Sequence, residues 1–419
     1  MSELESRVLA LAQEAKKASR TLALASSEQR NQALRAASQA LRQQAAGILT
    51  ANQKDLEAAR TKGLTEAMID RLRLDGPRLE AIAVACEAVA QLPDPVGEII
   101  EDWTRPNGLH IQKRRVPIGL VAIIFESRPN VTIDAAALCV KSGNGCVLRG
   151  GSEAIHTNIA LAEAFAQGLH QVGLPSAAVT LLPFTDRAAV PALGALRGIV
   201  DIIVPRGGPS LIETVVNSAK VPVIKHDAGI CHVYVHQAAN LAQALPLIIN
   251  AKCQRPSACN AAETVLVDAA IAQKFLPTLG AALQAQKTQI RGCPQTCAIL
   301  AQAQPATETD YRTEHLGLII NLKVVSGPAE AIQHIETYGS HHSDAILTEN
   351  EAVARTFLAE IDSACVYWNA STRFTDGGEF GFGAEVGIST DRLHARGPMG
   401  IRELTTWKFE ITGQGQIRG

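Results

Sequence analysis

One cysteine in this 419-residue chain has the setting of a reactive thiol. Cys259 ends the polar segment that starts at Asn250, between the apolar run Leu245–Ile249 and an expected strand at Glu263–Val267. Arg255 lies four residues upstream, and nearby positive charge favours the thiolate, which is the nucleophilic form of cysteine. A small buried apolar cysteine is the commoner alternative. The loop by itself therefore admits both catalysis and packing as interpretations.

Three loops that follow expected strands could hold a phosphorylated cofactor. The first, Glu126–Val131, carries Arg128 and Asn130. The other two place a glycine pair beside an arginine, which lets backbone amides approach phosphate at the start of a helix. Those two loops contain Arg149, Gly150, Gly151 and Ser152, and Arg206, Gly207 and Gly208. Neither matches the G-x-G-x-x-G fingerprint, so plain turns are the alternative, but two such turns favour cofactor binding.

The arginines of these turns also bear on which cofactor is bound. A guanidinium can bind a phosphate through two parallel hydrogen bonds, so the turns favour NADP over NAD. A third feature, the segment Trp368–Ile388, is rich in polar residues and glycine and has neither a helical nor a strand period. Its length favours a binding loop over a solvated connection.

Metal chemistry is not indicated by the sequence. Cys293 and Cys297 form the only tight cysteine pair, and no histidine or cysteine partners complete a zinc site. The adjacent His341 and His342 would diverge on most backbones. The nine cysteines are an odd number without disulfide-framework spacing, which fits a reducing cytosol.

The composition limits the class of protein. The chain is 47% hydrophobic and 4% aromatic, which suits α/β layers, and its length predicts two or more domains. A formal net charge of -2 gives no general attraction to nucleic acid or to an anionic membrane. The longest apolar run, Val116–Phe125, is too short to span a bilayer, and the N-terminus has no signal-peptide pattern. We therefore expect a soluble, cytoplasmic protein.

Apolar residues at helical spacing predict that residues 3–92 form helices. Beyond Glu98 two extended runs, Ile99–Arg105 and Leu109–Val116, flank Asn107 and Gly108, which is the strongest short hairpin signal. The final expected strand, Leu404–Ile411, alternates in the same way. The hairpin and this strand predict either a small arm that pairs with another subunit or an ordinary sheet edge.

From Gly119 strands and helices alternate, which predicts a parallel sheet covered on both faces. The expected strands of this first series are Leu120–Phe125, Cys146–Leu148, Val179–Leu182, Val200–Val204 and Val221–Ile224. A second series follows Cys259, with expected strands at Thr264–Val267, Gly317–Val325, Ala345–Leu347 and Ala364–Tyr367. The two domains should meet near residue 233, with Cys259 close to their junction.

Four motifs occur in order along the chain: Ile124–Val131, Gln254–Ala261, Phe380–Ile388 and Ala395–Gly400. Together they closely resemble the γ-glutamyl phosphate reductase family, the proline-biosynthesis branch of the aldehyde dehydrogenase superfamily. The resemblance covers nearly the whole chain. It implies an aldehyde dehydrogenase-like α/β fold with two doubly wound βα domains, parallel sheets and a β-arm for oligomerisation. The implied domains are an NADP-binding domain at 1–104 and 120–233, a catalytic domain at 234–385 and the β-arm at 105–119 and 400–419.

The resemblance also implies an activity: NADPH-dependent reduction of L-glutamyl 5-phosphate to L-glutamate 5-semialdehyde and phosphate through a cysteine thioester. This is the second step of proline biosynthesis from glutamate. A phosphate-independent semialdehyde dehydrogenase is the alternative, and a non-catalytic binding protein is a more distant one. Hydrolytic relatives carry a glutamate base where this chain has His226–Gly229, which argues against the first alternative. The implied partners are a second copy of the chain and, transiently, glutamate 5-kinase.

Residue roles follow from the resemblance position by position. Cys259 matches the nucleophile, and Glu314 matches the glutamate that holds the nicotinamide ribose. The two glycine turns supply the other cofactor-binding residues: Arg149, Gly150, Gly151, Ser152, Arg206, Gly207 and Gly208. The candidate substrate-binding residues are Arg128, Asn130, Arg255, Asn369, Ser371 and Thr372. Which arginine binds phosphate and which binds the substrate carboxylate stays open, as does the identity of the oxyanion donor.

Overall fold

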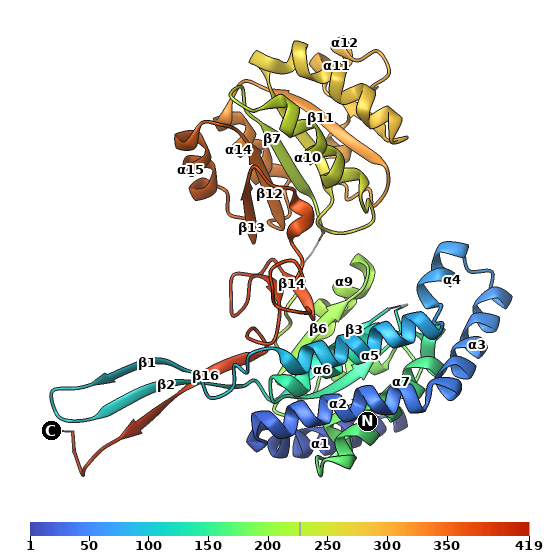
Figure 1. Cartoon of the computed structure of the whole chain (residues 1–419), viewed down its shortest axis with the longest axis vertical. Coiled ribbons are helices and arrows are strands. Elements are labelled where there is room, and N and C mark those ends of the chain that lie inside the picture. The colour runs from blue at the N-terminus through green and yellow to red at the C-terminus, as the bar shows by residue number, and fades with distance from the viewer. Residues whose placement is uncertain (127, 226–227, 419) are drawn as a thin grey trace. The chain divides into compact units, whose positions relative to one another are not determined.

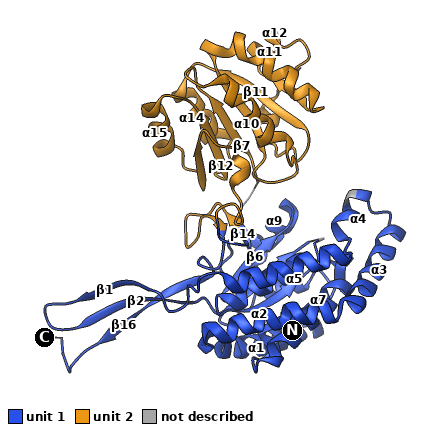
Figure 2. Ribbon diagram, in the orientation of Figure 1, with its two compact units in different colours: residues 1–225, 381–387, 399–419 blue, residues 226–380, 388–398 orange. Residues whose placement is uncertain are grey.

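The computed structural model describes residues 1–126, 128–225 and 228–418. The chain forms two compact units (Figure 2). Unit 1 comprises residues 1–225, 381–387 and 399–419, and unit 2 comprises residues 226–380 and 388–398. The first passage between the units follows Lys225, whereas the sequence analysis placed the domain junction near residue 233. The segment 381–385, assigned to the catalytic domain in the sequence analysis, belongs to unit 1.

The N-terminal part of unit 1 is helical, as predicted. Local capping explains where several of these helices begin. Ser2 and Glu5 form a capping box, the Ser26 hydroxyl accepts a hydrogen bond from the Gln29 amide, and the Asp75 carboxylate accepts one from the Arg78 amide. The helices are α1 (Glu3–Leu24), α2 (Ser27–Gln43), α3 (Ala45–Thr61), α4 (Glu66–Leu72) and α5 (Gly76–Gln91).

A four-stranded parallel sheet forms the centre of unit 1, in the order β5-β4-β3-β6. Every residue of β3 is buried, as expected for a strand covered on both faces. Because β4 and β5 lie on one side of β3 and β6 lies on the other, the strand order reverses beside β3, and such a reversal is where α/β sheets bind ligands. The strands are β3 (Leu120–Phe125), β4 (Gly145–Arg149), β5 (Val179–Leu181) and β6 (Ile202–Arg206).

Helices accompany each of these strands. The buried residues of α1, α8 and α9 share a hydrophobic core with β3, in which Val8, Leu193 and Val215 pack near Leu120 and Ile124. This core covers one face of the sheet, because Leu120 and Ile124 lie an even number of positions apart along β3 and therefore point to the same face. The helices of this region are α6 (Asn130–Lys141), α7 (Ile155–Gln171), α8 (Ala189–Gly194) and α9 (Pro209–Ser218).

The prediction of a strand at Val221–Ile224 is wrong. Only a single parallel bridge, between Val223 and Ile203, forms in this segment. Pro222 contributes its carbonyl to the amide of Ile203 at 2.9 Å, but it has no N–H to donate. Proline therefore prevents a continuous ladder here.

The predicted hairpin and C-terminal strand are confirmed and form a three-stranded antiparallel sheet, termed the arm, in the order β1-β2-β16. Gly108 has a φ of +86° in the turn, and the Arg105 amide donates to the Leu109 carbonyl at 2.8 Å. Figure 1 shows the three strands extending as a ribbon from the helices of unit 1. Their bounds are β1 (Ile99–Thr104), β2 (His110–Pro117) and β16 (Thr405–Thr412), so the arm starts before residue 105, the predicted limit.

Unit 2 contains a seven-stranded sheet in the order β10-β9-β11-β8-β7-β12-β13, and all of its pairs are parallel. The strands are β7 (Cys231–Val235), β8 (Ala262–Asp268), β9 (Gln289–Gly292), β10 (Gln304–Pro305), β11 (Ile319–Val325), β12 (Ser343–Leu347) and β13 (Cys365–Trp368). The sequence analysis predicted β8, β11, β12 and β13 and missed the other three.

Helices cover both faces of this sheet. Val233 and Val265 face a core shared with Leu279, whereas the intervening Tyr234 and Leu266 face a second core. Figure 1 shows α11 and α12 on one side of the sheet and α14 and α15 on the other. The helices are α10 (Leu241–Cys253), α11 (Ala269–Ala285), α12 (Pro294–Ile299), α13 (Glu308–Tyr311), α14 (Pro328–Tyr338) and α15 (Glu351–Glu360).

The segment Trp368–Ile388, which has no helical or strand period in the sequence, contains a 3₁₀ turn, η3 (Thr372–Phe374), and the start of β14 (Gly387–Ser389). Strand β14 pairs with β15 (Gly397–Met399), which lies beyond this segment, in a two-stranded sheet. The predicted fold class is confirmed: two α/β units with parallel sheets and a separate antiparallel sheet. Within the described part of the chain, no helix is both long enough and apolar enough to cross a membrane.

Candidate active site

Cys259 lies in a tight turn between the end of α10 and the start of β8. The Ala258 amide donates to the Arg255 carbonyl at 3.1 Å, and the Ala261 amide donates to the Ala258 carbonyl at 2.9 Å. These bonds fix the backbone on both sides of the cysteine. The residue is partly exposed, so the alternative of a cysteine sealed in the core does not describe this site.

The backbone of Cys259 packs directly against the segment that precedes β7. A Cβ atom at Gly229 would lie under 3.0 Å from the carbonyl of Cys259, so only glycine fits at this position. The Cys231 thiol donates to the same carbonyl, with 3.3 Å between sulfur and oxygen. Burial raises the pKa of the Cys231 thiol well above its ordinary value, which keeps it protonated as a donor. The first two residues of the predicted counterpart of the hydrolytic glutamate, His226–Gly229, lie outside the described residues.

Glu314 lies close to this turn. Its carboxylate accepts a hydrogen bond from the Gly229 amide, and burial raises the pKa of Glu314. Gly229 therefore contacts both the predicted nucleophile and the predicted ribose-binding glutamate. Cys259 and Glu314 precede β8 and β11, at the amino ends of parallel strands, which is the edge opposite the usual ligand-binding edge of such sheets.

The turn is also held by the segment around η3. The buried Thr372 hydroxyl donates to the Asn260 carbonyl at 2.7 Å, and the Asn260 side-chain amide donates to the Thr375 carbonyl at 2.8 Å. The buried Ser371 hydroxyl accepts from the Arg373 amide at 3.3 Å. Both hydroxyls were predicted to bind substrate. The Thr372 hydroxyl holds the loop against the residue that follows Cys259, whereas the Ser371 hydroxyl caps η3 within the loop.

Sequence reasoning missed three charged residues at this site. Arg373 donates from Nε to Oε1 of Gln254 at 2.9 Å and from Nη1 to Oδ1 of Asn260. Lys252 and Glu263 form a buried ion pair, and Oε1 of Glu263 also accepts from the Leu316 amide at 3.3 Å. Burial raises the pKa of Glu263 to about 7, opposed by the charge of Lys252. One indication of this ion pair was present in the sequence: Lys252 and Glu263 are charged residues in or beside segments that are otherwise apolar.

In unit 1 the loops after β3 and β6 meet beside the reversal in strand order. The Glu126 amide donates to the Arg206 carbonyl at 3.1 Å. The Gly208 amide, at the start of α9, donates to Oε2 of Glu126 at 3.0 Å, and a Cβ at Gly207 would lie 2.6 Å from that oxygen. A helix N-terminus attracts anions, and here it already binds a carboxylate. Arg206 lies 3.9 Å from Oε1 of Glu385.

Arg149 ends β4 and is nearly buried. Its Nη2 donates to the carbonyls of Thr185 at 3.3 Å and Asp186 at 3.4 Å, whereas its buried Nε has no hydrogen-bond partner in the described structure. Burial lowers the pKa of Arg149. The next residue, Gly150, has no room for a Cβ because Asn158 would lie under 3.0 Å away.

These features of unit 1 fit the phosphate groups of a dinucleotide. The unpartnered guanidinium nitrogen of Arg149 is a donor suited to phosphate, and the start of α9 could bind a phosphate if that anion displaced the Glu126 carboxylate. Gly151 is buried, whereas Ser152 is exposed at the start of a 3₁₀ turn. No group of three or more histidine, cysteine, aspartate or glutamate residues that could hold a metal ion occurs among the described residues.

The remaining predicted residues lie as follows. Arg128 and Asn130 are exposed in unit 1, and the Asn130 side-chain amide donates to Asp134 at 2.8 Å. Arg255 is exposed in the Cys259 turn of unit 2. Asn369 has a φ of +53°, and its side chain bonds the amide and the carbonyl of Thr348, each at 2.9 Å. This geometry gives Asn369 a structural role.

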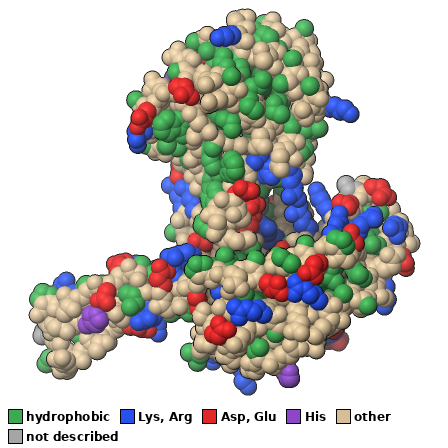
Figure 3. All heavy atoms as spheres, in the orientation of Figure 1, with side chains coloured by type: hydrophobic (Ala, Val, Ile, Leu, Met, Phe, Trp, Pro, Cys, Tyr) green, Lys and Arg blue, Asp and Glu red, His purple; other side chains and the backbone are tan. Residues whose placement is uncertain are grey.

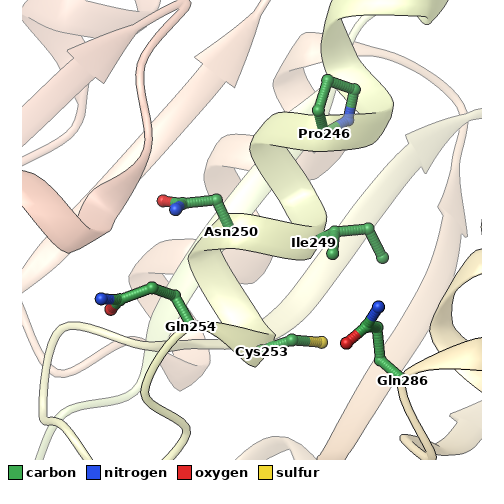
Figure 4. Close-up of a pocket in the computed structure, with 6 residues that line it drawn as sticks. All are labelled: Pro246, Ile249, Asn250, Cys253, Gln254 and Gln286. Atoms are coloured by element: carbon green, nitrogen blue, oxygen red, sulfur yellow. The ribbon is translucent and has the colours of Figure 1, made fainter.

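A cavity of about 320 Å³ lies beside α10 in unit 2. Figure 4 shows the side chains of Cys253 and Gln286 pointing toward one another at this cavity. It is lined by Pro246, Ile249, Asn250, Cys253, Gln254 and Gln286. None of the predicted site residues lines it, so the cavity is not the candidate active site.

Comparison with known proteins gives consistent results. Residues 3–296 match the Aldehyde dehydrogenase family. The γ-glutamyl phosphate reductase of Wolinella succinogenes is 52% identical over 409 residues, covering 98% of this chain and 99% of that protein. The corresponding enzyme of Carboxydothermus hydrogenoformans is 53% identical over 412 residues, covering 98% and 99%. The crystal structure of the Thermotoga maritima γ-glutamyl phosphate reductase has a TM-score of 0.97 at 47% identity, covering 98% of this chain and 100% of that one.

Proposed function

The chain belongs to the aldehyde dehydrogenase family, in its γ-glutamyl phosphate reductase branch, and we propose from this that it reduces L-glutamyl 5-phosphate to L-glutamate 5-semialdehyde. The reaction releases phosphate and is the second step of proline biosynthesis from glutamate. The observation that carries the proposal is the placement of Cys259, a partly exposed thiol on a turn whose backbone is fixed by Gly229 and Cys231.

The first chemical step uses this thiol. The Cys259 thiolate attacks the acyl carbon of the substrate, so that a carbon–sulfur bond forms and the bond to the phosphate oxygen breaks. The phosphate leaves with the bonding electron pair, and little acid catalysis is needed because phosphate is a good leaving group. Backbone N–H groups around Cys259 are proposed to stabilise the oxyanion. The product of this step is a thioester on Cys259.

The family uses a nicotinamide cofactor, which when bound supplies a hydride to the thioester carbon. The adduct on Cys259 then collapses: the carbon–sulfur bond breaks, its electrons return to sulfur, and the aldehyde is released. We propose that the cofactor is NADPH and that Arg149 binds its extra phosphate, since this guanidinium is always charged and has a nitrogen to spare. Glu314 is proposed to bind the nicotinamide ribose. The other cofactor-binding residues are proposed to be Gly150, Gly151, Ser152, Arg206, Gly207 and Gly208.

The proposed substrate contacts come from the exposed polar residues. Arg255 and Arg128 can each bind an anionic group of the substrate, and Asn130 can bind a neutral polar one. We propose that Asn369, Ser371 and Thr372 act indirectly, because their side chains are bonded to backbone groups. They hold the loop that contacts the Cys259 turn.

The arm is proposed to join copies of the chain. Trp407, Phe409 and Ile411 alternate along β16, and each of their side chains is about half exposed. Strand β16 is also an edge of its sheet, and an exposed apolar edge strand favours pairing with another chain. Charged side chains of both signs lie along the arm as well (Figure 3), as in a specific rather than an indiscriminate interface.

Two further proposals concern the setting of the reaction. In the described structure none of the nine cysteines forms a disulfide, which supports a reducing compartment and hence the cytoplasm. The acyl phosphate is labile, so a transient contact with glutamate 5-kinase would protect it during transfer.

The decisive experiment runs the reaction in reverse. The purified protein is mixed with glutamate semialdehyde, NADP and phosphate, and NADP reduction is followed by absorbance. Activity should require phosphate, and Cys259→Ser should abolish it while NADPH binding is kept. Activity that is unchanged when phosphate is omitted would indicate the phosphate-independent dehydrogenase instead, and a fully active Cys259→Ser protein would exclude this nucleophile.

A further inference from the structure

The guanidinium of Arg373 contacts both ends of the Cys259 turn. Its Nε donates to Gln254 at 2.9 Å, and its Nη1 donates to the side chain of Asn260. Gln254 follows α10 directly, and Asn260 follows Cys259. One side chain from a distant loop therefore spans the segment that carries the nucleophile.

The backbone of Arg373 is fixed as well. Its amide donates to the Ser371 hydroxyl at 3.3 Å, and its carbonyl accepts from the Asn260 side chain at 3.3 Å. The Thr372 hydroxyl adds a third bond to the Asn260 carbonyl. The position of the guanidinium beside the turn is thus set by backbone contacts, independently of its own hydrogen bonds.

The hydrogen-bond acceptors of this guanidinium, Gln254 and Asn260, are uncharged amides. Arg255 directly follows Gln254, the residue that Arg373 contacts. Burial lowers the pKa of Arg373, and the positive charge of Arg255 lowers this pKa further. The groups that oppose this effect are Cys259, Asp376 and Cys231, of which the Cys231 thiol stays protonated. Asp376 accepts the Gly378 amide at 2.8 Å. Two guanidiniums held near each other repel unless an anion lies between them.

We propose that Arg373 and Arg255 together bind the phosphoryl group of the substrate beside Cys259 and hold the phosphate as it leaves. This inference rests on the proposed function. It answers the question left open there, namely which arginine binds the phosphate and which binds the substrate carboxylate. The phosphoryl group is attached to the carbon that the thiolate attacks, whereas the substrate carboxylate lies at its far end. Cations bonded to the nucleophile turn are therefore placed for the phosphate.

The same placement would assist the reaction. As the carbon–sulfur bond forms, the carbon–oxygen bond breaks and its electron pair passes to the phosphate oxygen. Negative charge grows on that oxygen, and charge-assisted hydrogen bonds from guanidinium groups stabilise it. The proton that the Cys259 thiol releases on becoming a thiolate passes to the leaving phosphate, which therefore departs as hydrogen phosphate, a dianion bound between two cations.

The test measures the KM for inorganic phosphate in the reverse reaction with glutamate semialdehyde and NADP. Arg373→Gln should raise this KM by about 10- to 100-fold, as expected for loss of a hydrogen bond to a charged group. The KM values for the semialdehyde and NADP should change little. Arg373→Lys should recover part of the loss, since it restores charge but not the planar fork. The matched control is Arg355→Gln, an exposed arginine of α15 paired with Glu351, which should leave all three constants unchanged.

A second readout does not depend on turnover. Inorganic phosphate should slow alkylation of Cys259 by iodoacetamide in the wild-type protein, and this protection should be lost in Arg373→Gln. If Arg373→Gln does not fold, as judged by thermal unfolding and NADPH binding, the exposed Arg255→Gln is measured in its place and should show the same loss. An unchanged phosphate KM with intact protection would overturn the inference. A selective rise in the semialdehyde KM would overturn it as well, by assigning Arg373 to the carboxylate. A wild-type protein without phosphate-dependent activity would instead contradict the proposed function.

Discussion

The ammonium group of Lys252 lies 2.6 Å from Oε2 of Glu263, and both side chains are shielded from solvent. Lys252 belongs to the last turn of α10, before Cys259, and Glu263 belongs to β8, after it. The pair therefore joins the two elements that carry the nucleophile turn. Because Glu263 also accepts the Leu316 amide, it ties the segment that follows Glu314 to the same point.

Deleting one partner of this pair should destabilise the protein strongly. Glu263→Ala leaves the charge of Lys252 buried without a partner, and such losses cost about 3–5 kcal/mol of unfolding free energy. The double variant Lys252→Met, Glu263→Leu should cost less, because neither charge remains. Urea unfolding of the single and double variants measures the difference. The exposed pair Glu351 and Arg355 is the control, and its disruption should cost under about 1 kcal/mol; equal losses at both sites would contradict a buried, coupled pair.

The same carboxyl predicts a pH dependence of stability. Burial raises the pKa of Glu263 from 4.5 to about 7, so in this interval the folded protein keeps a proton that the unfolded chain releases. Stability should therefore fall as pH rises from 4.5 toward 7, by about 3 kcal/mol from this group, and level off above. In Glu263→Gln that slope should be absent. Unfolding free energies measured across this pH range compare the two proteins, and parallel curves would exclude the shift.

Sequence patterns within a single element correctly predicted the strand β3 and the hairpin turn of the arm. The run Leu120–Phe125 is apolar throughout and became a fully buried strand, and Gly108 supplied the positive φ of the hairpin. Strand β7 was missed because His232 interrupts its apolar pattern. The structure accommodates that histidine by pairing it with Asp344 of the neighbouring strand at 2.9 Å, which only the assembled sheet can provide.

At the candidate site, too, features within one short segment were predictable from sequence, whereas contacts between distant segments were not. The reactive setting of Cys259 was visible in its own turn and in the resemblance of that turn to a family motif. Arg373 was not, because its partner Asn260 lies 113 residues away in the sequence and nothing near Arg373 marks the contact. Gly229 was noted only as part of a missing glutamate motif, although its role is to leave space for the Cys259 carbonyl.

Gly229→Ala tests that space directly. The added methyl group would overlap the Cys259 carbonyl, so the turn must shift, at a cost of about 1–3 kcal/mol in stability. Misplacing a reacting atom by about 1 Å can cost roughly 100-fold in rate, and we expect kcat to fall by about that factor. Steady-state kinetics and Cys259 alkylation rates measure the effect. Gly47→Ala in α3 is the control, since nothing lies within 4 Å of its Cβ position; it should keep full activity, and a fully active Gly229→Ala would refute the packing argument.

Arg149→Gln tests the choice of cofactor. If this guanidinium binds the phosphate that distinguishes NADPH from NADH, its loss should raise the KM for NADPH by about 10-fold or more, as for other charged hydrogen bonds. The KM for NADH should change little. The ratio of kcat/KM values for the two cofactors is the measurement. A loss of equal size with both cofactors would place Arg149 elsewhere on the dinucleotide or in a purely structural role.

The arm predicts that self-association depends on one apolar face. Trp103, Phe409 and Trp407 form a contiguous set, with ring centroids 6.0 Å and 5.1 Å apart, and Lys113 lies 4.5 Å from the Trp407 ring. This side of β16 is only partly covered within unit 1, since Trp407 is 48% exposed. Burying such a surface against a second copy is favourable by about 25 cal/mol per Å², whereas a charge placed there must be desolvated. The double variant Trp407→Glu, Ile411→Lys should therefore lower the mass found by sedimentation, while Leu24→Lys, on the exposed end of α1, should leave it unchanged. A wild-type protein that sediments as a monomer, or a variant that keeps the wild-type mass, would show that the face has another use.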